Sequence, residues 1–288
     1  MDDSHLPGIY HDAEKASAHG QSVTLRLSRV RLFGAVLAAI GGAFKWKIGG
    51  GVDVWAWVAL AGFLVALFSE FLLWAMHPEL RWNAGRAVAE RVKSLAWRYA
   101  VGGDPFPTDS PRARRELEEK IDEIVAEHTA KLLLTSTNPA GEQAMDALRA
   151  KPFAERRDAY RETRVLGQLT WYSERAKRNE RRTTLWRFLL FGGEFVAIVL
   201  AILRIAGVWD VDLSGVMAAA VAGGAAWIGL RQYENLGLSY LAAAGDLARI
   251  HRQLAFAEES DWATTVAEAE AVISKEHAAW LASRPSTT

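Results

Sequence analysis

Three charged residues lie inside long apolar stretches of this chain, namely Glu70, Glu194 and Arg204. A charge in the hydrocarbon of a bilayer costs several kcal/mol unless it faces water or a partner. Each glutamate shares a helical face with small residues, which are Gly62 and Ala66 beside Glu70, and Ala197 and Ala201 beside Glu194. Small residues let another helix approach closely. These three positions are therefore candidates for buried helix contacts or for charges along an ion path.

A second group of candidates is basic and flanks the apolar stretches. Its members are Arg86, Arg91 and Lys93 after the second stretch, and Arg175, Arg178, Arg181 and Arg182 before the third. Juxtamembrane arginines and lysines fix the orientation of a membrane protein and attract anionic lipid head groups. The alternative interpretation is that these side chains hold a cytoplasmic anionic ligand.

The sequence lacks the residue patterns of the common enzyme classes. It contains no G-x-G-x-x-G, no Walker loop, no G-x-S-x-G and no H-E-x-x-H, and its seven histidines are scattered. It contains no cysteine, which excludes disulfides and thiolate metal sites. Its 34 basic and 34 acidic residues leave no net charge to attract nucleic acid. We therefore expect neither an enzyme, nor a cofactor, nor a bound metal, nor a nucleic-acid partner.

The fold that would position these charges is all-α and membrane-spanning. Residues 54–76 carry no charge except Glu70, and as a helix they would be about 34 Å long, which is enough to cross a bilayer. Four spans are predicted, at about 32–48, 54–76, 188–208 and 213–230. The first is short, with only the 13 uncharged residues 32–44, and the alternative there is a buried or re-entrant segment. The glycines at 49–51 and the aspartates Asp210 and Asp212 mark the turns that would join them into two transmembrane hairpins.

Long helices outside the hairpins complete the predicted organisation. Residues 1–20 are polar and are predicted to be a flexible terminus. Residues 21–150 form a first hairpin with cytoplasmic helices, and residues 151–288 form a second. The helices carry apolar stripes at steps of three and four, typical of coiled-coil contacts. The two halves share a layout, which indicates a duplicated architecture.

The distribution of lysine and arginine predicts the topology. These residues crowd the outer flanks of both hairpins, whereas Lys45 and Lys47 are the only ones in the two hairpin loops. By the positive-inside rule, both termini and residues 77–187 lie in the cytoplasm. Glu70 and Glu194 are then each six residues inside the cytoplasmic end of a span, about 9 Å deep. Around an oligomer axis they would form carboxylate rings that favour cations. Alternatively, each is hydrogen-bonded within a bundle, or protonated, and carries no ions.

Three helical segments resemble the SLATT family of bacterial two-transmembrane domains. They are GRAVAERVKSLAWRYAVGGDPF, WYSERAKRNERRTTLWR and EAVISKEHAAWLA. The chain resembles a tandem of two such units, covering about 20–150 and 155–285. The positions that match are Arg86, Glu90, Lys93, Trp97 and Tyr99 in the first unit, and Trp171, Tyr172, Arg175, Glu276 and Trp280 in the second.

The resemblance implies a membrane effector of bacterial conflict systems. Such effectors are associated with nucleotide-second-messenger synthases or nucleotide-sensing domains, and are thought to form pores. We therefore expect a homo-oligomer in the lipid bilayer of the bacterial inner membrane, a pore or channel controlled by cytoplasmic helices and by a cytoplasmic nucleotide-signalling or sensor partner. The alternative is a non-conducting scaffold that recruits a soluble partner.

Overall fold

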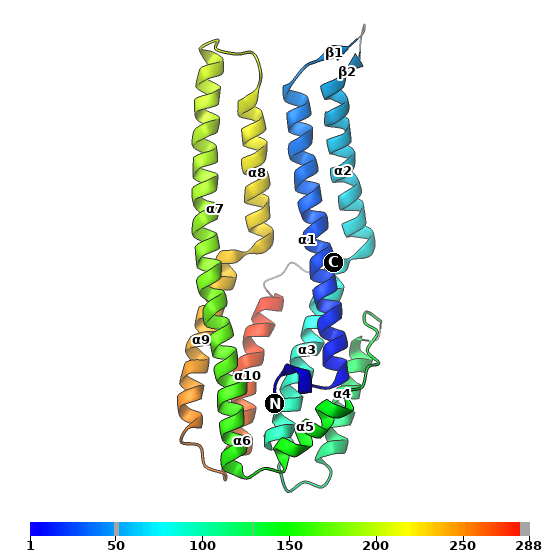
Figure 1. Ribbon diagram of the computed structural model, residues 1–288, viewed down its shortest axis with the longest axis vertical. Coiled ribbons are helices and arrows are strands. Elements are labelled where there is room, and N and C mark those ends of the chain that lie inside the picture. Colours follow the sequence, from blue (N-terminus) through cyan, green and yellow to red (C-terminus); the bar gives the residue numbers. More distant parts are fainter. Residues whose placement is uncertain (49–51, 129, 283–288) are drawn as a thin grey trace. The chain divides into compact units, whose positions relative to one another are not determined.

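The computed structural model describes residues 1–48, 52–128 and 130–282, with the backbone alone at 47–48, 52 and 275–282. The chain is almost entirely helical (Figure 1). Its elements, in order, are η1 Asp3–His5, α1 Gly8–Ala43, β1 Lys47–Ile48, β2 Val52–Asp53, α2 Val54–Met76, α3 Pro78–Val101, α4 Ala113–His128, α5 Pro139–Arg149, α6 Phe153–Ala159, the π-helix η2 Tyr160–Leu166, α7 Gly167–Ile205, α8 Leu213–Arg231, α9 Tyr233–Leu254 and α10 Trp262–Ala282. The predicted glycine turn at 49–51 lies outside the described residues.

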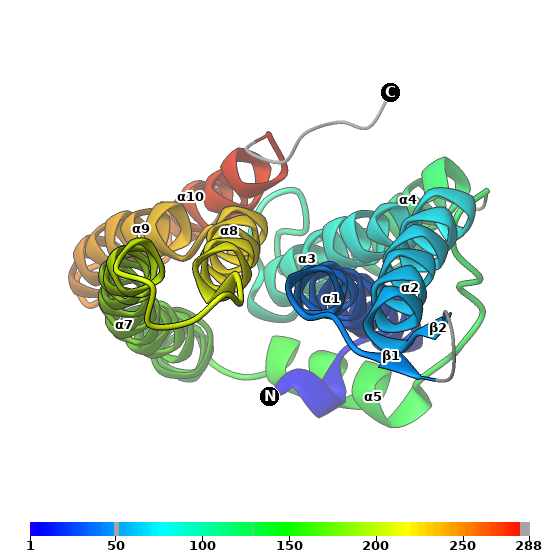
Figure 2. The ribbon, with the colours of Figure 1, turned by 90° about the horizontal axis from the view of Figure 1, so that it is seen from above.

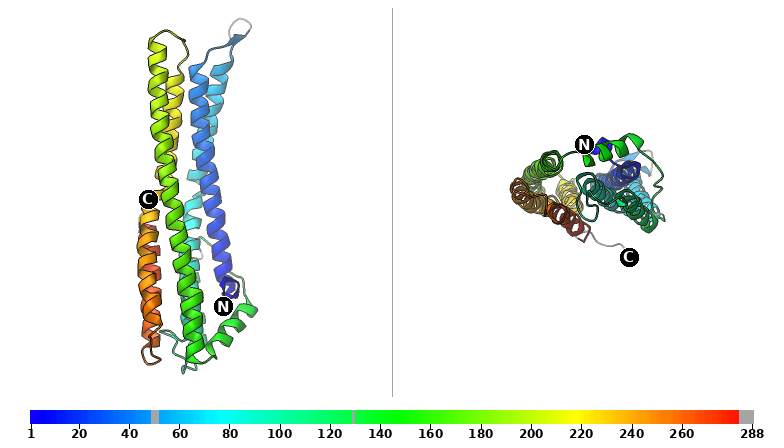
Figure 3. Two further views of the ribbon diagram at one scale, coloured as in Figure 1. Left: turned by 60° about the vertical axis from the view of Figure 1, so that its left-hand side comes forward. Right: turned by 90° about the horizontal axis from the view of Figure 1, so that it is seen from below.

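The chain folds into two compact units that cut across the sequence halves. Unit 1 comprises Met1–Gly20, Glu79–Arg178 and Leu236–Thr288, and unit 2 comprises Gln21–Pro78 and Asn179–Asn235. Each predicted half therefore contributes to both units. The helices α6, η2 and α7 follow one another without a break over the 53 residues Phe153–Ile205 (Figure 3), and the boundary between the units falls within them.

Unit 1 has an aromatic and aliphatic core. Trp97 and Trp262 both meet the ring of Tyr160 edge-on, at centroid distances of 6.0 and 5.8 Å. The indole N–H of Trp262 donates to the Val101 carbonyl at 2.7 Å, so its one polar group is satisfied while the ring is buried. The predicted stripes of α3, α4 and α10 supply much of the remaining core, including Val88, Val92, Leu117, Ile121, Ile124, Val266 and Ile273.

The N-terminal residues are part of this core, which corrects the predicted flexible segment 1–20. Helix α1 begins at Gly8, and Leu6, Tyr10 and Ala13 are buried. The Asp12 carboxylate accepts the backbone N–H groups of Thr135 and Ser136 at 3.0 and 2.9 Å. The polar composition hid three apolar residues at steps of four and three, which is helical spacing.

Unit 2 consists of two antiparallel helical hairpins. Residues 21–43 of α1 pair with α2, and residues 179–205 of α7 pair with α8, as seen both from the side and from above (Figures 1 and 2). Asp53 caps α2 by accepting the Trp55 N–H at 3.1 Å, and Asp212 caps α8 by accepting the Gly215 N–H at 3.0 Å. A two-residue antiparallel ladder, with Lys47 opposite Asp53, closes the base of the first turn.

Three helices of the described chain, not four, are long and apolar enough to cross a membrane. They are Val54–Met76 (α2), Phe153–Ile205 (α6, η2 and α7 together) and Leu213–Leu254 (α8 and α9 together). The predicted span at 32–48 does not qualify, because its helix ends at Ala43 instead of continuing to Ile48. The last 18 residues of that helix begin at Arg26 and also contain Arg29 and Arg31, so they are too charged to count as a span on composition alone.

Candidate functional site

The helices of unit 2 expose apolar side chains over most of their surface. In the most apolar 18-residue stretch of α2 only 11% of the residues are buried, and in the corresponding stretches of α7 and α8 none is buried. Exposed side chains include Phe63, Leu67 and Phe68 on α2, and Phe191, Phe195 and Ile198 on α7. Soluble proteins rarely expose a continuous apolar surface of this extent. Such exposure is instead typical of helices that span a bilayer.

Glycines hold the first hairpin together at very short range. A Cβ atom at Gly41 would lie 2.3 Å from the backbone nitrogen of Ala59, and one at Gly62 would lie 2.5 Å from that of Ala38. Neither position tolerates a side chain, because the obstacle is backbone. Backbones that approach this closely are typical of membrane helices, whose association depends on packing and not on apolar burial.

Glu70 lies on this hairpin and forms an ion pair with Arg31 of α1. Its neighbour Ser69 is buried and donates to the Val65 carbonyl at 2.8 Å. The pairing joins α1 to α2 and gives a cationic partner to the one charge of the apolar helix α2. The structure therefore shows an intramolecular partner for Glu70.

Glu194 of α7 is in a different situation. Its side chain is exposed, and within the described part of the chain it has neither a hydrogen bond nor an ion pair. The adjacent Gly193 faces α8, where its Cβ position is 2.7 Å from Val221 Cγ2. Glu194 is thus exposed on the third predicted span, where an isolated carboxylate would be costly in lipid.

Arg204 lies near the far end of α7 and pairs with Asp212 at 2.9 Å. Asp212 precedes α8, and its pKa is lowered mainly by the backbone N–H of Gly215, with smaller contributions from Ser214 and Arg204. The arginine and the aspartate therefore close the second hairpin at its loop.

The basic candidates divide between the units. Arg86, Arg91 and Lys93 lie on α3 in unit 1, where Arg91 pairs with Glu127 and Lys93 pairs with Asp3 at 2.6 Å. Arg175 stacks on Trp171 at 4.7 Å, and Arg178 is exposed on the same helix. Arg181 and Arg182 belong to unit 2, and Arg182 stacks on Tyr233 at 5.6 Å. The structure therefore does not gather these residues into one site.

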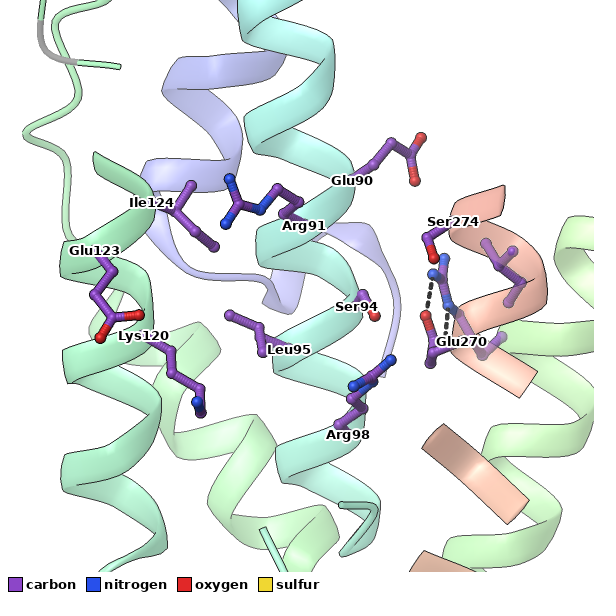
Figure 4. A pocket seen from close by; sticks show the side chains of 12 residues that line it. Glu90, Arg91, Ser94, Leu95, Arg98, Lys120, Glu123, Ile124, Glu270 and Ser274 are labelled. Atoms are coloured by element: carbon purple, nitrogen blue, oxygen red, sulfur yellow. Dashed lines mark hydrogen bonds and ion pairs between the residues drawn. The ribbon is translucent and has the colours of Figure 1, made fainter. Parts of the chain in front are cut away.

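A cavity of about 320 Å³ lies in unit 1 among α3, α4 and α10 (Figure 4). Its charged lining is nearly balanced, with Arg91, Arg98, Lys120 and Arg164 against Glu90, Glu123 and Glu270. At its wall, the fully buried Glu270 accepts two bonds from Arg164, at 2.9 and 2.8 Å, and one from the Tyr160 hydroxyl at 3.0 Å. This buried ion pair joins η2 to α10.

Electrostatics keeps both partners of that pair charged. Burial raises the pKa of Glu270, but the charge and hydrogen bonds of Arg164, together with hydrogen bonds from Tyr160 and Ser94, outweigh burial, and the net pKa is lowered. Burial and the nearby carboxylate raise the pKa of Tyr160 well above its usual value. Arg164 Nη1 and Arg98 Nε have no hydrogen-bond partner among the described residues.

The sequence interpretation missed this pair, although a signal was present. Glu270 stands four residues after Val266 and three before Ile273, which places it on the apolar stripe of α10. A carboxylate on a buried stripe requires a cation. The partner was not readable, because Arg164 is more than a hundred residues away and lies in a segment with several arginines.

Comparisons with known families agree with the predicted tandem. Residues 7–157 match the family described as SMODS and SLOG-associating 2TM effector domain 3. Residues 160–280 match the family described as SMODS and SLOG-associating 2TM effector domain 1. No curated protein and no solved structure matches the chain. The boundary between the two matches falls in α6 and η2, just before α7.

Proposed function

The chain belongs to the SLATT family as a tandem of two of its two-transmembrane effector domains, and on that premise we propose that it forms an oligomeric pore in the bacterial inner membrane. In this proposal the four helices of unit 2 cross the bilayer as two hairpins, with both termini in the cytoplasm. Unit 1 lies on the cytoplasmic side and controls the path. The effect on a cell would be loss of the ion gradients across the membrane, in a defence or conflict system.

The proposal counts residues 32–43 of α1 as a span, although this segment is short. Gly34 and Gly41 pack against α2 at backbone contact distance, and Arg31 pairs with Glu70. A helix held so closely enters the bilayer together with its neighbour. Arg26 and Arg29 would then lie at the cytoplasmic interface, where long side chains extend into the head-group region.

The exposed Glu194 is the observation that supports an oligomer and a path. A carboxylate on the lipid-facing surface of a span is stable only if a second copy or water covers it. In a ring of subunits, copies of Glu194 would meet at one level and attract cations. Glu70 would not contribute, because Arg31 neutralises it.

Purified protein in liposomes tests this proposal. We expect a homo-oligomer in nanodiscs and a cation flux that Glu194→Gln reduces, because the ring loses its charge. Glu70→Gln is the matched control, since it changes a glutamate at the same predicted depth outside the path. A monomer in nanodiscs, or an unchanged cation flux in Glu194→Gln, would contradict the proposal.

A non-conducting scaffold that recruits a soluble partner is the second candidate. Two large apolar side chains of unit 1 favour it, because Leu133 is 84% exposed and Phe256 is 86% exposed. Both lie between helices, where a cytoplasmic nucleotide-signalling or sensor protein could bind them. Capture of one stoichiometric partner by the wild type, lost in the variant L133S/F256S, with no flux in liposomes, would favour the scaffold.

A further inference from the structure

A second cavity, of about 690 Å³, lies within unit 2 among α1, α7 and α8. One end is lined by Arg29, Arg182 and Arg231, one from each helix or helix end, and the lining contains no carboxylate within the described residues. The other end is apolar. It is lined by Phe33 and Val36 of α1, Leu185 and Trp186 of α7, and the two glycines Gly223 and Gly224 of α8.

The basic end is a continuous cluster of guanidinium groups and aromatic rings. Arg29 and Arg231 both lie over the Trp227 ring, at 5.0 and 5.8 Å. Arg182 and Arg231 both lie over the Tyr233 ring, at 5.6 and 5.3 Å. Stacking uses the faces of the guanidinium groups and leaves their in-plane N–H donors for acceptors. Among these donors, the structure shows one bond, from Arg231 Nε to the Tyr233 hydroxyl at 3.2 Å.

In all three helices the arginine lies at the same end of the cavity and the apolar lining residues lie at the other end. On α1 and α7 the apolar lining residues follow the arginine, and on α8, which runs antiparallel to α7, they precede it. The three arginines therefore share one end of the cavity. In the proposed topology this is the cytoplasmic interface, and the apolar end points toward the middle of the bilayer.

Small residues of α8 provide the space at the apolar end. A Cβ atom at Gly223 would meet only Val36 Cγ2, at 3.7 Å, which is ordinary contact. At Gly224 it would meet Leu190 and Trp186, at 3.1 and 3.4 Å. Position 223 thus opens into the cavity, and a branched side chain there would fill it.

We propose that this cavity binds one anionic phospholipid, with its phosphate among Arg29, Arg182 and Arg231 and the start of an acyl chain along Phe33, Leu185 and Gly223. Three uncompensated guanidinium groups select a negatively charged head group, since arginine binds phosphate through paired charge-assisted hydrogen bonds. The apolar end selects a lipid over free phosphate. The site rests on the proposed membrane insertion of unit 2, and it does not depend on pore formation.

Lipid retention on the full chain tests the inference. The protein is delipidated in neutral detergent, offered equal phosphatidylglycerol and phosphatidylcholine, and analysed by native mass spectrometry. We expect one tightly held phosphatidylglycerol per chain. In the variant R29Q/R182Q/R231Q its retention should fall by at least about tenfold, because the charge-assisted bonds are lost. The control is Arg187→Gln on the same helix as Arg182, because Arg187 pairs with Glu234 outside the cavity.

A steric variant tests the acyl position separately. Gly223→Leu should release phosphatidylglycerol, whereas Gly229→Leu on the same helix should not, because nothing lies within 4 Å of its Cβ position. Any of three results would overturn the site. They are equal retention of the two lipids by the wild type, equal loss in Arg187→Gln and the triple variant, and full retention in Gly223→Leu. A chain that fails to enter liposomes at all would instead contradict the proposed function.

Discussion

Unit 1 has a core of buried large side chains, whereas the helices of unit 2 expose most of theirs. Trp97, Trp262 and Tyr160 are enclosed in unit 1, while the closest backbone contacts between α1 and α2 in unit 2 are at glycine and alanine. The hydrophobic effect stabilises the first arrangement, because water is the alternative environment of those rings. It cannot stabilise the second in lipid, where close backbone packing replaces it. The contrast indicates that unit 1 is suited to water and unit 2 to a lipid bilayer.

Two ion pairs, one from each unit, differ in the same way. Arg164 and Glu270 are 1% and 0% exposed, with a tyrosine hydroxyl as a third member. Arg31 and Glu70 in unit 2 are 38% and 56% exposed, so their surroundings depend on what covers the helix. The first pair is a fixed part of a core, and the second joins two helices at the surface of a hairpin.

The largest effect is expected for Glu270→Gln. Removing one partner leaves a buried guanidinium uncompensated, which costs about 3–5 kcal/mol. Amide hydrogen exchange of α10 in the full chain measures this as about a hundred-fold to several thousand-fold faster exchange. Glu127→Gln, which breaks the exposed pair with Arg91, should leave the exchange of α4 nearly unchanged. Similar effects of both changes would remove the distinction between a buried and an exposed pair.

An acidic residue in the middle of the third span should have the next largest effect. Ile198 is 58% exposed in unit 2, and Ile198→Asp should disfavour insertion by about 3 kcal/mol. The fraction of chains whose loop at Asp210 reaches the outside measures insertion. Phe256→Asp, at a more exposed apolar position of unit 1, should leave that fraction unchanged. Equal behaviour of the two variants would mean that both units face the same solvent.

Packing of the first hairpin should respond to side-chain size at adjacent glycines. Gly41→Leu places a side chain against the backbone of Ala59 and should destabilise the chain by about 1–3 kcal/mol. Gly42→Leu is the matched control, since nothing lies within 4 Å of its Cβ position. Thermal unfolding in detergent compares them. If Gly42→Leu lowered the unfolding temperature as much as Gly41→Leu, the close contact between α1 and α2 would be wrong.

The smallest effect is the pH dependence of unit 1. The pKa of Glu270 is lowered on folding, so its stabilisation is present above the unfolded value and is lost as the pH falls through the folded value. Exchange of α10 should therefore accelerate on acidification beyond its intrinsic pH dependence. Glu270→Gln should lack this acceleration. An identical acid response in the wild type and the variant would assign the effect to other carboxylates.

Much of this contrast was readable from the sequence, because it depends on local pattern. Hydropathy predicted α2, α7 and α8 as spans, and helical stripes predicted the core residues Val88, Leu117 and Val266. The tandem was recognised and is confirmed by the family matches.

The failures concern contacts between distant residues. Residues 1–20 were predicted to be flexible because few of them are apolar. Leu6, Tyr10 and Ala13 are nevertheless buried, against α3 and the segment near Ser136. The pairs Arg31–Glu70 and Arg164–Glu270 and the cluster around Trp227 join residues far apart in sequence. Spacing along one helix identifies a face, but it does not identify what that face meets.

Cysteine accessibility tests the central claim most directly, because the chain has no native cysteine. Single variants Ile198→Cys in unit 2 and Phe256→Cys in unit 1 are labelled with a membrane-impermeant maleimide in inverted inner-membrane vesicles. The account predicts rapid labelling at position 256 and protection at position 198 until detergent is added. Labelling of position 198 in intact vesicles as fast as position 256 would contradict the assignment of unit 2 to the bilayer.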